Sequence, residues 1–284
     1  MKRACDDLRW LLALSLCLIL GAPQGARSEE ASAWSRDTHS AMRLIAGSNV
    51  IPGAPLRAGI ELRLDNGWKT YWRYAGDSGV PTSFDFGGSQ NAKSVTVLWP
   101  APQRFADGAG GSAIGYTGAV IFPVHVVAEN PAKPVVLKAT ASYGVCGKIC
   151  IPARGTAVLR LGRNASGENM QLAAAEARVP RPAAVRAAGP LAIRAVHYNK
   201  SAPQPQVIVD VHVPDGAEAD LFVEGPDERW ALPLPRPLGS AKGAERRFVF
   251  AVDGVPRGSD IRGAKIRLTL VAGERAIEVV SGLD

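Results

Sequence analysis

The chain has 284 residues, of which 46% are hydrophobic and 21% charged, with a formal net charge of +7. This composition is typical of globular proteins and excludes a disordered, collagen-like or coiled-coil chain. Beyond the N-terminus no apolar run reaches the 18 residues of a membrane span, which excludes a polytopic membrane protein. The basic residues are scattered and form no recognisable nucleic-acid module, so we expect no nucleic-acid partner.

The N-terminal segment is organised like a secretory signal peptide. Three basic residues precede an apolar run over residues 10–20, and small and polar residues follow up to Ser28. The small residues of Ala26-Arg27-Ser28 favour cleavage after residue 28, with cleavage after residue 26 or an uncleaved anchor as alternatives. We therefore expect residues 1–28 to be removed and the mature chain to be exported.

From about residue 41 to residue 162, short apolar segments alternate with turn residues. Ile60, Leu62 and Leu64 alternate with charged residues, which indicates a half-buried strand with one solvated face. Eight such segments at this spacing predict a β-sandwich. The expected strands are 41–46, 58–64, 68–74, 82–86, 94–99, 119–128, 135–143 and 157–161.

Cleavage of the signal peptide leaves Cys146 and Cys150 as a single pair in an oxidising compartment. The segment from Tyr143 to Pro152 is expected to be a turn between two strands, in which two glycines let the sulfurs approach bonding distance. A disulfide stabilises most when it closes a long loop, and this loop is short. A labile bond that exchanges through thiolates is favoured, and Lys148 would favour the thiolate electrostatically.

Two other interpretations of the cysteine pair stay open at this point. One is a structural staple, and the other is metal ligation, for example of copper(I). Thiolate metal sites usually have three or four ligands, and the histidines and methionines of the mature chain form no ligand-spacing motif with the pair.

Residues 168–178 are rich in alanine and predict a helix, which Pro180 and Pro182 end. Beyond this connector, apolar segments again alternate with proline and glycine, which predicts a second, smaller sandwich. Its expected strands are 191–198, 206–213, 219–223, 230–234, 246–252, 265–271 and 276–280. The predicted divisions are a signal peptide (1–28), a first sandwich domain (29–163), a connector (164–189) and a second sandwich domain (190–284).

Several motifs together resemble one family. The chain from about residue 40 to residue 162 resembles the N-terminal periplasmic domain of the DsbD/ScsB thiol:disulfide interchange proteins. The connector and the second sandwich resemble the longer N-terminal region of the ScsB-like branch. The segments that carry the resemblance are 66–81, 99–105, 115–116, 122–124 and 143–152.

The resemblance implies an all-β fold of two immunoglobulin-like β-sandwich domains joined by a short helical connector. It also implies that Cys150 is the nucleophile that forms a mixed disulfide with partners, and that Cys146 resolves it. Tyr71 falls where the family places an aromatic residue beside the disulfide. Residues 105–114 fall where the family places a cap that shields the sulfurs.

The chain departs from the family in two respects. Its cap contains Ala109 among glycines and lacks the shielding phenylalanine of the best-known members, so shielding is expected from Phe105 or Tyr116. The chain also ends at Asp284 without the family's membrane domain or its thioredoxin-like Cys-x-x-Cys domain. We therefore expect the electrons to come from a separate protein.

These observations predict a periplasmic protein-disulfide reductase component that needs no cofactor and no metal. It would pass electrons from a membrane donor of the DsbD/CcdA type, or from a thioredoxin-like donor, to oxidised periplasmic proteins with a thioredoxin fold. The alternative is a non-enzymatic binding module with a permanent disulfide, or a copper(I)-binding protein linked to copper tolerance.

Overall fold

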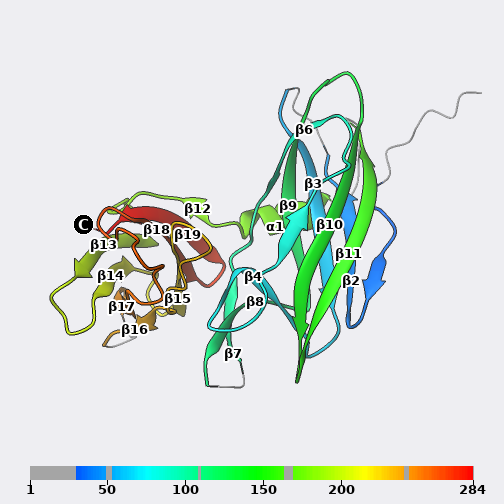
Figure 1. Cartoon of the computed structure of the whole chain (residues 1–284). Helices are drawn as coiled ribbons and strands as arrows, with labels where there is room; N and C mark the ends of the chain where they lie inside the picture. Colours follow the sequence, from blue (N-terminus) through cyan, green and yellow to red (C-terminus); the bar gives the residue numbers. More distant parts are fainter. Residues whose placement is uncertain (1–29, 49–52, 108–109, 163–168, 240–242, 284) are drawn as a thin grey trace, which may run out of the picture.

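A computed structural model describes residues 30–48, 53–107, 110–162, 169–239 and 243–283. Within these ranges the chain consists of mainly antiparallel strands and one helix, α1 (Asn169–Ala177), and it forms two lobes side by side (Figure 1). The predicted fold class, two β-sandwiches joined by a helical connector, is confirmed. The predicted signal peptide lies outside the described residues. No helix in the described part of the chain is long and apolar enough to cross a membrane.

The first sandwich packs a five-stranded sheet against a six-stranded sheet. In spatial order the five-stranded sheet is β1 (Ser35–Asp37), β2 (Ser40–Ala46), β3 (Leu56–Leu64), β9 (Ala119–Ala128) and β6 (Ala92–Val97). The six-stranded sheet is β11 (Cys150–Leu161), β10 (Val135–Cys146), β4 (Lys69–Gly76), β8 (Ser112–Thr117) and β7 (Gln103–Ala106), with β5 (Ser83–Asp85) paired to β10.

Apolar side chains from both sheets fill the space between them. Ile60 and Leu62 are buried, as their alternation predicted, and aromatic rings gather around Phe122. Glu61 was expected on a solvated face but is only 3% exposed. Its burial is possible because both carboxylate oxygens accept hydrogen bonds, one from Arg43 and one from Arg63.

The second sandwich contains two four-stranded sheets. Its core is mainly aliphatic, with valines alternating along the strand that begins at Gln206. The first sheet is β12 (Arg181–Pro182), β19 (Arg275–Gly282), β18 (Lys265–Ala272) and β15 (Ala219–Glu224). The second is β13 (Ala192–Asn199), β14 (Gln206–His212), β17 (Glu245–Ala251) and β16 (Arg236–Pro237).

The strand pattern of the structure differs from the prediction in two ways. The short strands β1, β7, β8, β12 and β16 were not predicted, because they lack the length over which alternation is visible. The strand predicted over residues 230–234 is wrong, because Pro233 and Pro235 remove backbone donors from this segment. Trp230 and Leu232 are buried in the second core from an irregular segment instead.

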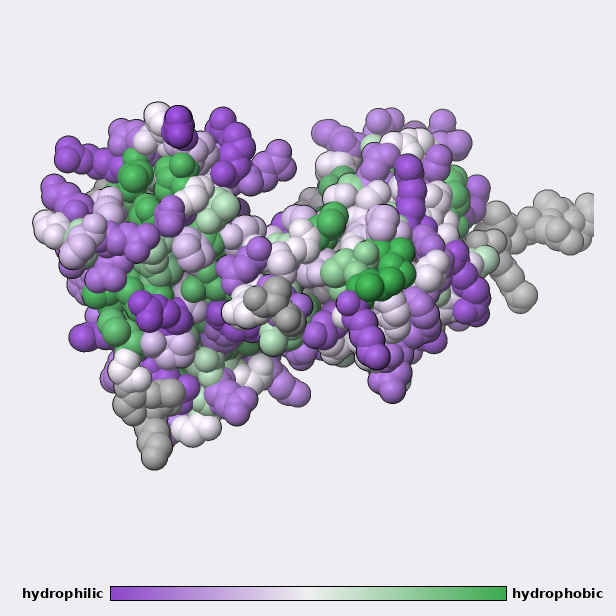
Figure 2. Space-filling model, turned by 60° about the horizontal axis from the view of Figure 1, so that its bottom comes forward, coloured by the Kyte–Doolittle hydropathy of each residue, from purple (hydrophilic) through white to green (hydrophobic). Residues whose placement is uncertain are grey.

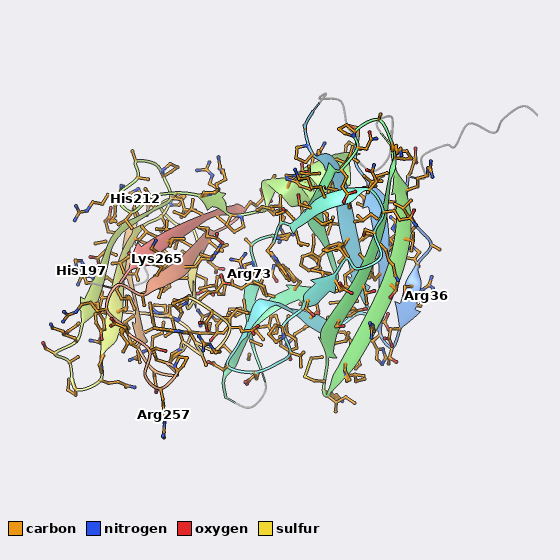
Figure 3. All side chains as sticks on the ribbon, turned by 45° about the horizontal axis from the view of Figure 1, so that its top comes forward. Arg36, Arg73, His197, His212, Arg257 and Lys265 are labelled. Carbon is orange, nitrogen blue, oxygen red and sulfur yellow. A yellow bond between two sulfur atoms is a disulfide. The ribbon has the colours of Figure 1, made fainter. Side chains whose placement is uncertain are left out.

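Partly buried charges join the two sandwiches. Arg73 of β4 lies between them (Figure 3) and donates hydrogen bonds to the carboxylates of Glu224 and Glu278 at 2.6–2.8 Å. Tyr74 donates to the carbonyl oxygen of Leu232 at 2.6 Å. Burial opposes the charge of Arg73, but its two glutamate partners outweigh this and raise its pKa. Strand β4 is thus attached to the second sandwich.

The surface shows the same division into two lobes. Polar residues cover most of the view in Figure 2, and hydrophobic residues form separate patches on each lobe. Among the described residues, the large hydrophobic side chains that are exposed include Val80 and Ile149, which are 57% and 66% exposed. Both belong to loops near the cysteine pair.

Candidate functional site

The two cysteines close the end of a long β-hairpin. Strands β10 and β11 pair without interruption from Val135 opposite Leu161 to Cys146 opposite Cys150. Only residues 147–149 form the loop, in which the amide of Gly147 donates to the carbonyl of Ile149 at 3.0 Å. The cysteines are the last register pair, with Cα atoms 4.1 Å apart, and their sulfurs form a disulfide. The turn is thus shorter than predicted, because the strands on both sides extend into the segment from Tyr143 to Pro152.

The two cysteines differ in exposure. Cys146 is 6% exposed and packs in a small cluster with Tyr71, Ala75 and Ala113. Cys150 is exposed at the start of β11. A partner protein can therefore reach Cys150 more readily than Cys146.

The hydroxyl of Tyr71 contacts both sulfurs, at 2.8 Å from Cys146 Sγ and 3.2 Å from Cys150 Sγ. Burial, and secondly the negative charge of Asp107, raises the pKa of Tyr71. The hydroxyl therefore keeps its proton at neutral pH and can donate a hydrogen bond to either sulfur. The predicted position of Tyr71 beside the disulfide agrees with this geometry.

A loop that the sequence prediction overlooked covers the Tyr71 ring. Gly79 has a φ of +114° and lies so close that a Cβ atom there would overlap this ring. The loop is tied to β8, because Asp77 and Ser112 exchange two hydrogen bonds of 3.0 Å. The signal available in the sequence was the pair of glycines at 76 and 79, which favours a tight backbone path.

The predicted cap is the hairpin of β7 and β8. Phe105 packs against the cluster that contains Cys146, whereas Cys150 stays exposed. Asp107 accepts hydrogen bonds from Ser78 at 3.1 Å and from the amide of Gly111 at 2.9 Å, which joins the cap to the loop over Tyr71. Ala109, also predicted to belong to the cap, lies outside the described residues.

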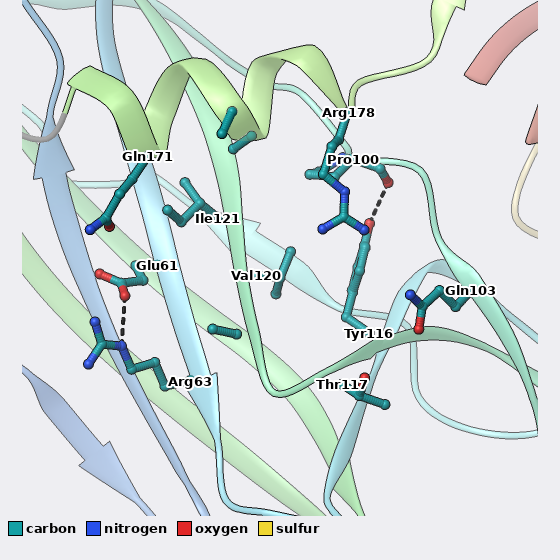
Figure 4. Close-up of a pocket in the computed structure, with 13 residues that line it drawn as sticks. Glu61, Arg63, Pro100, Gln103, Tyr116, Thr117, Val120, Ile121, Gln171 and Arg178 are labelled. Atoms are coloured by element: carbon teal, nitrogen blue, oxygen red, sulfur yellow. Dashed lines mark hydrogen bonds and ion pairs between the residues drawn. The ribbon is translucent and has the colours of Figure 1, made fainter. Parts of the chain in front are cut away.

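Tyr116 lies elsewhere. It is buried in the main core against Phe122, and its hydroxyl donates to the carbonyl of Pro100 at 2.8 Å. It also lines a pocket of about 420 Å³ beneath α1 (Figure 4). The structure therefore does not bring Tyr116 to the disulfide.

Two lysines accompany the cysteines. Lys148 is exposed in the loop between them. Lys69 was not predicted, although it is the register partner of Cys146 on β4. Its Nζ lies 4.6 Å from the centre of the Phe105 ring and 3.5 Å from the carbonyl of Ala106. This places a positive charge against the cap, on the strand that pairs with Cys146.

The Trp68 ring packs against the loop between the cysteines. A Cβ atom on Gly147 would lie 3.2 Å from the indole ring. The ring also stacks on His39 at a centroid distance of 3.9 Å, and His39 Nδ1 lies 2.9 Å from a carboxylate oxygen of Asp65. The hairpin end thus rests on a stacked pair of rings.

Residues 41–161 match the model of one protein family, described as thiol:disulfide interchange protein DsbD, N-terminal. The match spans nearly all of the first sandwich, which is therefore similar to a DsbD N-terminal domain. This confirms the resemblance predicted from the motifs. No curated protein matches the chain.

A solved structure extends the likeness beyond the DsbD N-terminal domain. The crystal structure of the N-terminal periplasmic domain of ScsB from Proteus mirabilis matches with a TM-score of 0.68 and 20% sequence identity. The match covers 90% of this chain and 99% of that chain. At this identity the match shows the fold, which includes a second sandwich after the DsbD N-terminal domain.

Proposed function

We propose that this protein is a periplasmic thiol-disulfide exchange protein. It relays electrons through Cys146 and Cys150 from a membrane or thioredoxin-like donor to oxidised periplasmic thiol proteins. The observation that carries the proposal is the asymmetric disulfide of a domain similar to a DsbD N-terminal domain. One sulfur belongs to a buried residue, the other to an exposed one, and a single tyrosine hydroxyl contacts both.

The position of the disulfide argues against a structural staple. A cross-link stabilises by removing conformations from the unfolded chain, and it removes few when it encloses three residues. The strands on either side are already held by a continuous backbone ladder from Val135 opposite Leu161. The bond adds little that the hairpin lacks, so its presence suits exchange better than stabilisation.

The reaction follows from the order of the two sulfurs. The Cys150 thiolate attacks one sulfur of the partner disulfide, forms a mixed disulfide and releases the partner's other sulfur as a thiolate, which takes up a proton. The Cys146 thiolate then attacks Cys150 Sγ, re-forms the intramolecular disulfide and releases the second partner sulfur. Two electrons pass to the partner, and a donor dithiol restores the pair by the reverse steps.

Tyr71 supports both thiolate stages. Its raised pKa keeps a proton on the hydroxyl, which can donate a hydrogen bond to whichever sulfur carries the negative charge. Lys69, the register partner of Cys146, and Lys148, in the loop between the cysteines, add positive charge near the pair. These groups would lower the free energy of the thiolate relative to the thiol.

The surface around Cys150 suits a protein partner. Ile149 precedes it and is exposed, and Val80 lies beside Gly144 on the loop over Tyr71 and is exposed as well. An apolar rim of this kind can be covered by a partner whose own cysteine must come within bonding distance. We propose a thioredoxin-fold protein as that partner.

Two measurements test the proposed function. The first is the reduction potential of the pair, from free thiols after equilibration of the purified protein in thiol/disulfide buffers. A value of about −180 to −270 mV is expected for a carrier. A value below about −300 mV would contradict the proposal and assign the bond a structural role.

The second measurement uses single-cysteine variants and an oxidised thioredoxin-fold partner. Cys150→Ala should abolish reduction of the partner, because the attacking sulfur is lost. Cys146→Ala should accumulate a mixed disulfide, which non-reducing electrophoresis detects. Turnover by Cys150→Ala at the unaltered rate would rule out the assigned roles.

A further inference from the structure

The strand β7 is held on both of its faces. Successive side chains of a strand point to opposite faces, and Arg104 and Phe105 are neighbours in β7. Phe105 packs against the cluster that contains Tyr71 and Cys146. Arg104 binds the second sandwich. Strand β7 therefore connects the second sandwich, through Arg104, to the cysteine cluster, through Phe105.

The contact that Arg104 makes is bidentate. Its Nε and Nη2 donate to the two carboxylate oxygens of Asp220 at 2.8 and 2.7 Å. Nη2 also donates to the carbonyls of Leu221 at 3.2 Å and Pro235 at 2.8 Å. The Arg104 and Asp220 side chains are 25% and 29% exposed, so water screens the pair only in part.

The remaining backbone attachment of β7 is weak. The strand lies at the edge of its sheet and pairs only with β8, over the four register positions from Gln103 to Ala106. An edge strand has a hydrogen-bonded neighbour on one side only. The Arg104 side chain therefore adds an attachment, on one face of β7, to the single backbone ladder with β8.

We propose that Arg104 is a positioning residue that ties β7 to the second sandwich and thereby keeps Phe105 packed against the cluster of Tyr71 and Cys146. The inference rests on the proposed function, since it concerns access to the same disulfide. It gives the second sandwich a part in the exchange reaction: it anchors the cap. Loss of the anchor raises the fraction of molecules in which Phe105 has moved away from the disulfide.

The test compares two arginine variants of the full chain. Arg104→Ala removes the anchor. Arg57→Ala removes a matched pair, because Arg57 also binds a carboxylate, that of Glu176, through two hydrogen bonds of 2.8 and 2.6 Å. The side chains of that pair are 29% and 25% exposed, and they join β3 to α1.

The measured quantity is the rate at which dithiothreitol reduces the disulfide, followed by free thiols, together with the Tm of each variant. Arg104→Ala should raise the rate about five- to tenfold, whereas Arg57→Ala should change it less than about twofold. An unchanged rate in Arg104→Ala, or an equal rise in both variants, would overturn the inference.

A second variant covers the case in which Arg104→Ala does not fold. Asp220→Asn keeps the shape of the acceptor but removes its charge, and it should also raise the rate, by a smaller factor.

Reduction by dithiothreitol needs no partner protein, so this result is separate from the relay of electrons. If Arg104→Ala raises the rate but the protein reduces no thioredoxin-fold partner, the role of Arg104 is supported and the proposed function is contradicted. If the protein reduces the partner but Arg104→Ala leaves the dithiothreitol rate unchanged, the proposed function is supported and the role of Arg104 is contradicted.

Discussion

Strand β4 takes part in two regions of opposite character. At its beginning, Tyr71 faces a disulfide with one exposed cysteine, where a bond can be made and broken. Farther along, Arg73 and Tyr74 face the second sandwich, and both side chains have hydrogen-bond partners there. The difference teaches that the first region is arranged for a change of covalent state and the second for a fixed contact. Substitutions in the second should therefore change stability, and those in the first should change reactivity.

The largest stability effect is expected from Trp72→Ala. Trp72 is fully buried in the core and contacts Phe222 of the second sandwich at a ring distance of 6.0 Å. Its truncation should lower the free energy of unfolding by about 3–5 kcal/mol, measured by urea denaturation. Trp34→Ala is the control, because that ring is only partly buried. An equal loss of unfolding free energy in both variants would contradict the special weight of the contact between the sandwiches.

Arg73→Ala should follow, with a loss of about 2 kcal/mol in the free energy of unfolding, because two glutamates are left without their shared partner. Arg267→Ala provides the control. Arg267 binds the same Glu278 but is 45% exposed and lies within the second sandwich. The control should lose less stability. The same or a larger loss in the control would show that the contact between sandwiches carries no special weight.

Alkaline pH should weaken the fixed contact. An unfolded tyrosine loses its proton near pH 10, whereas burial, with the charges of Asp77 and Glu224, raises the pKa of Tyr74 to about 12. Between these values the folded state binds more protons, so stability falls as the pH rises from 10 to 12. Urea midpoints at pH 8 and pH 11 measure this loss. In Tyr74→Phe the loss between the two pH values should be smaller, and an unchanged loss would assign it to other groups.

Tyr71→Phe should change reactivity rather than stability. It removes the hydrogen bond to the sulfurs but keeps the ring that fills the cluster. The reduced protein should react with iodoacetamide at neutral pH about three- to tenfold more slowly, because less thiolate is present. The Tm should stay within about 2 °C of the parent value. A large fall in Tm without a change in alkylation would reverse the roles of the two regions.

Lys148→Gln should give the smallest effect. Its ammonium group is exposed, so its influence on the neighbouring thiolates is screened by water and salt. Alkylation of the reduced pair should slow about twofold at low ionic strength, and the difference should vanish at about 1 M salt. An effect that persists at high salt would point to a direct contact instead.

Sequence patterns predicted the local part of the site and missed the long-range part. The spacing of Cys146 and Cys150 implied a hairpin end, and the family motif placed Tyr71 beside it. Tyr116 was placed beside the disulfide as an alternative to Phe105, but the register of β8 sets Gly115 opposite Tyr71 and Tyr116 opposite Thr70. A shift of one residue sends a side chain to the other face of a sheet, and one-dimensional spacing does not specify the register.

The contacts between sandwiches were beyond sequence reasoning for a different reason. Arg104 and Asp220 are separated by 116 positions, and Arg73 and Glu278 by 205. A single sequence contains many arginines and carboxylates, and nothing local pairs one with another. Such pairs follow only from the tertiary arrangement, whereas the strands that carry them follow from alternation.

The stacking of Trp68 on the cysteine loop gives the molecule an optical signal of its own. The indole ring lies against Gly147, between the two cysteines, so opening of the disulfide alters the surroundings of this ring directly. Tryptophan emission should therefore change when the pair is reduced, and Trp68→Phe should remove most of that change. The natural chain can thus report its own oxidation state in a fluorimeter, without a label and in real time.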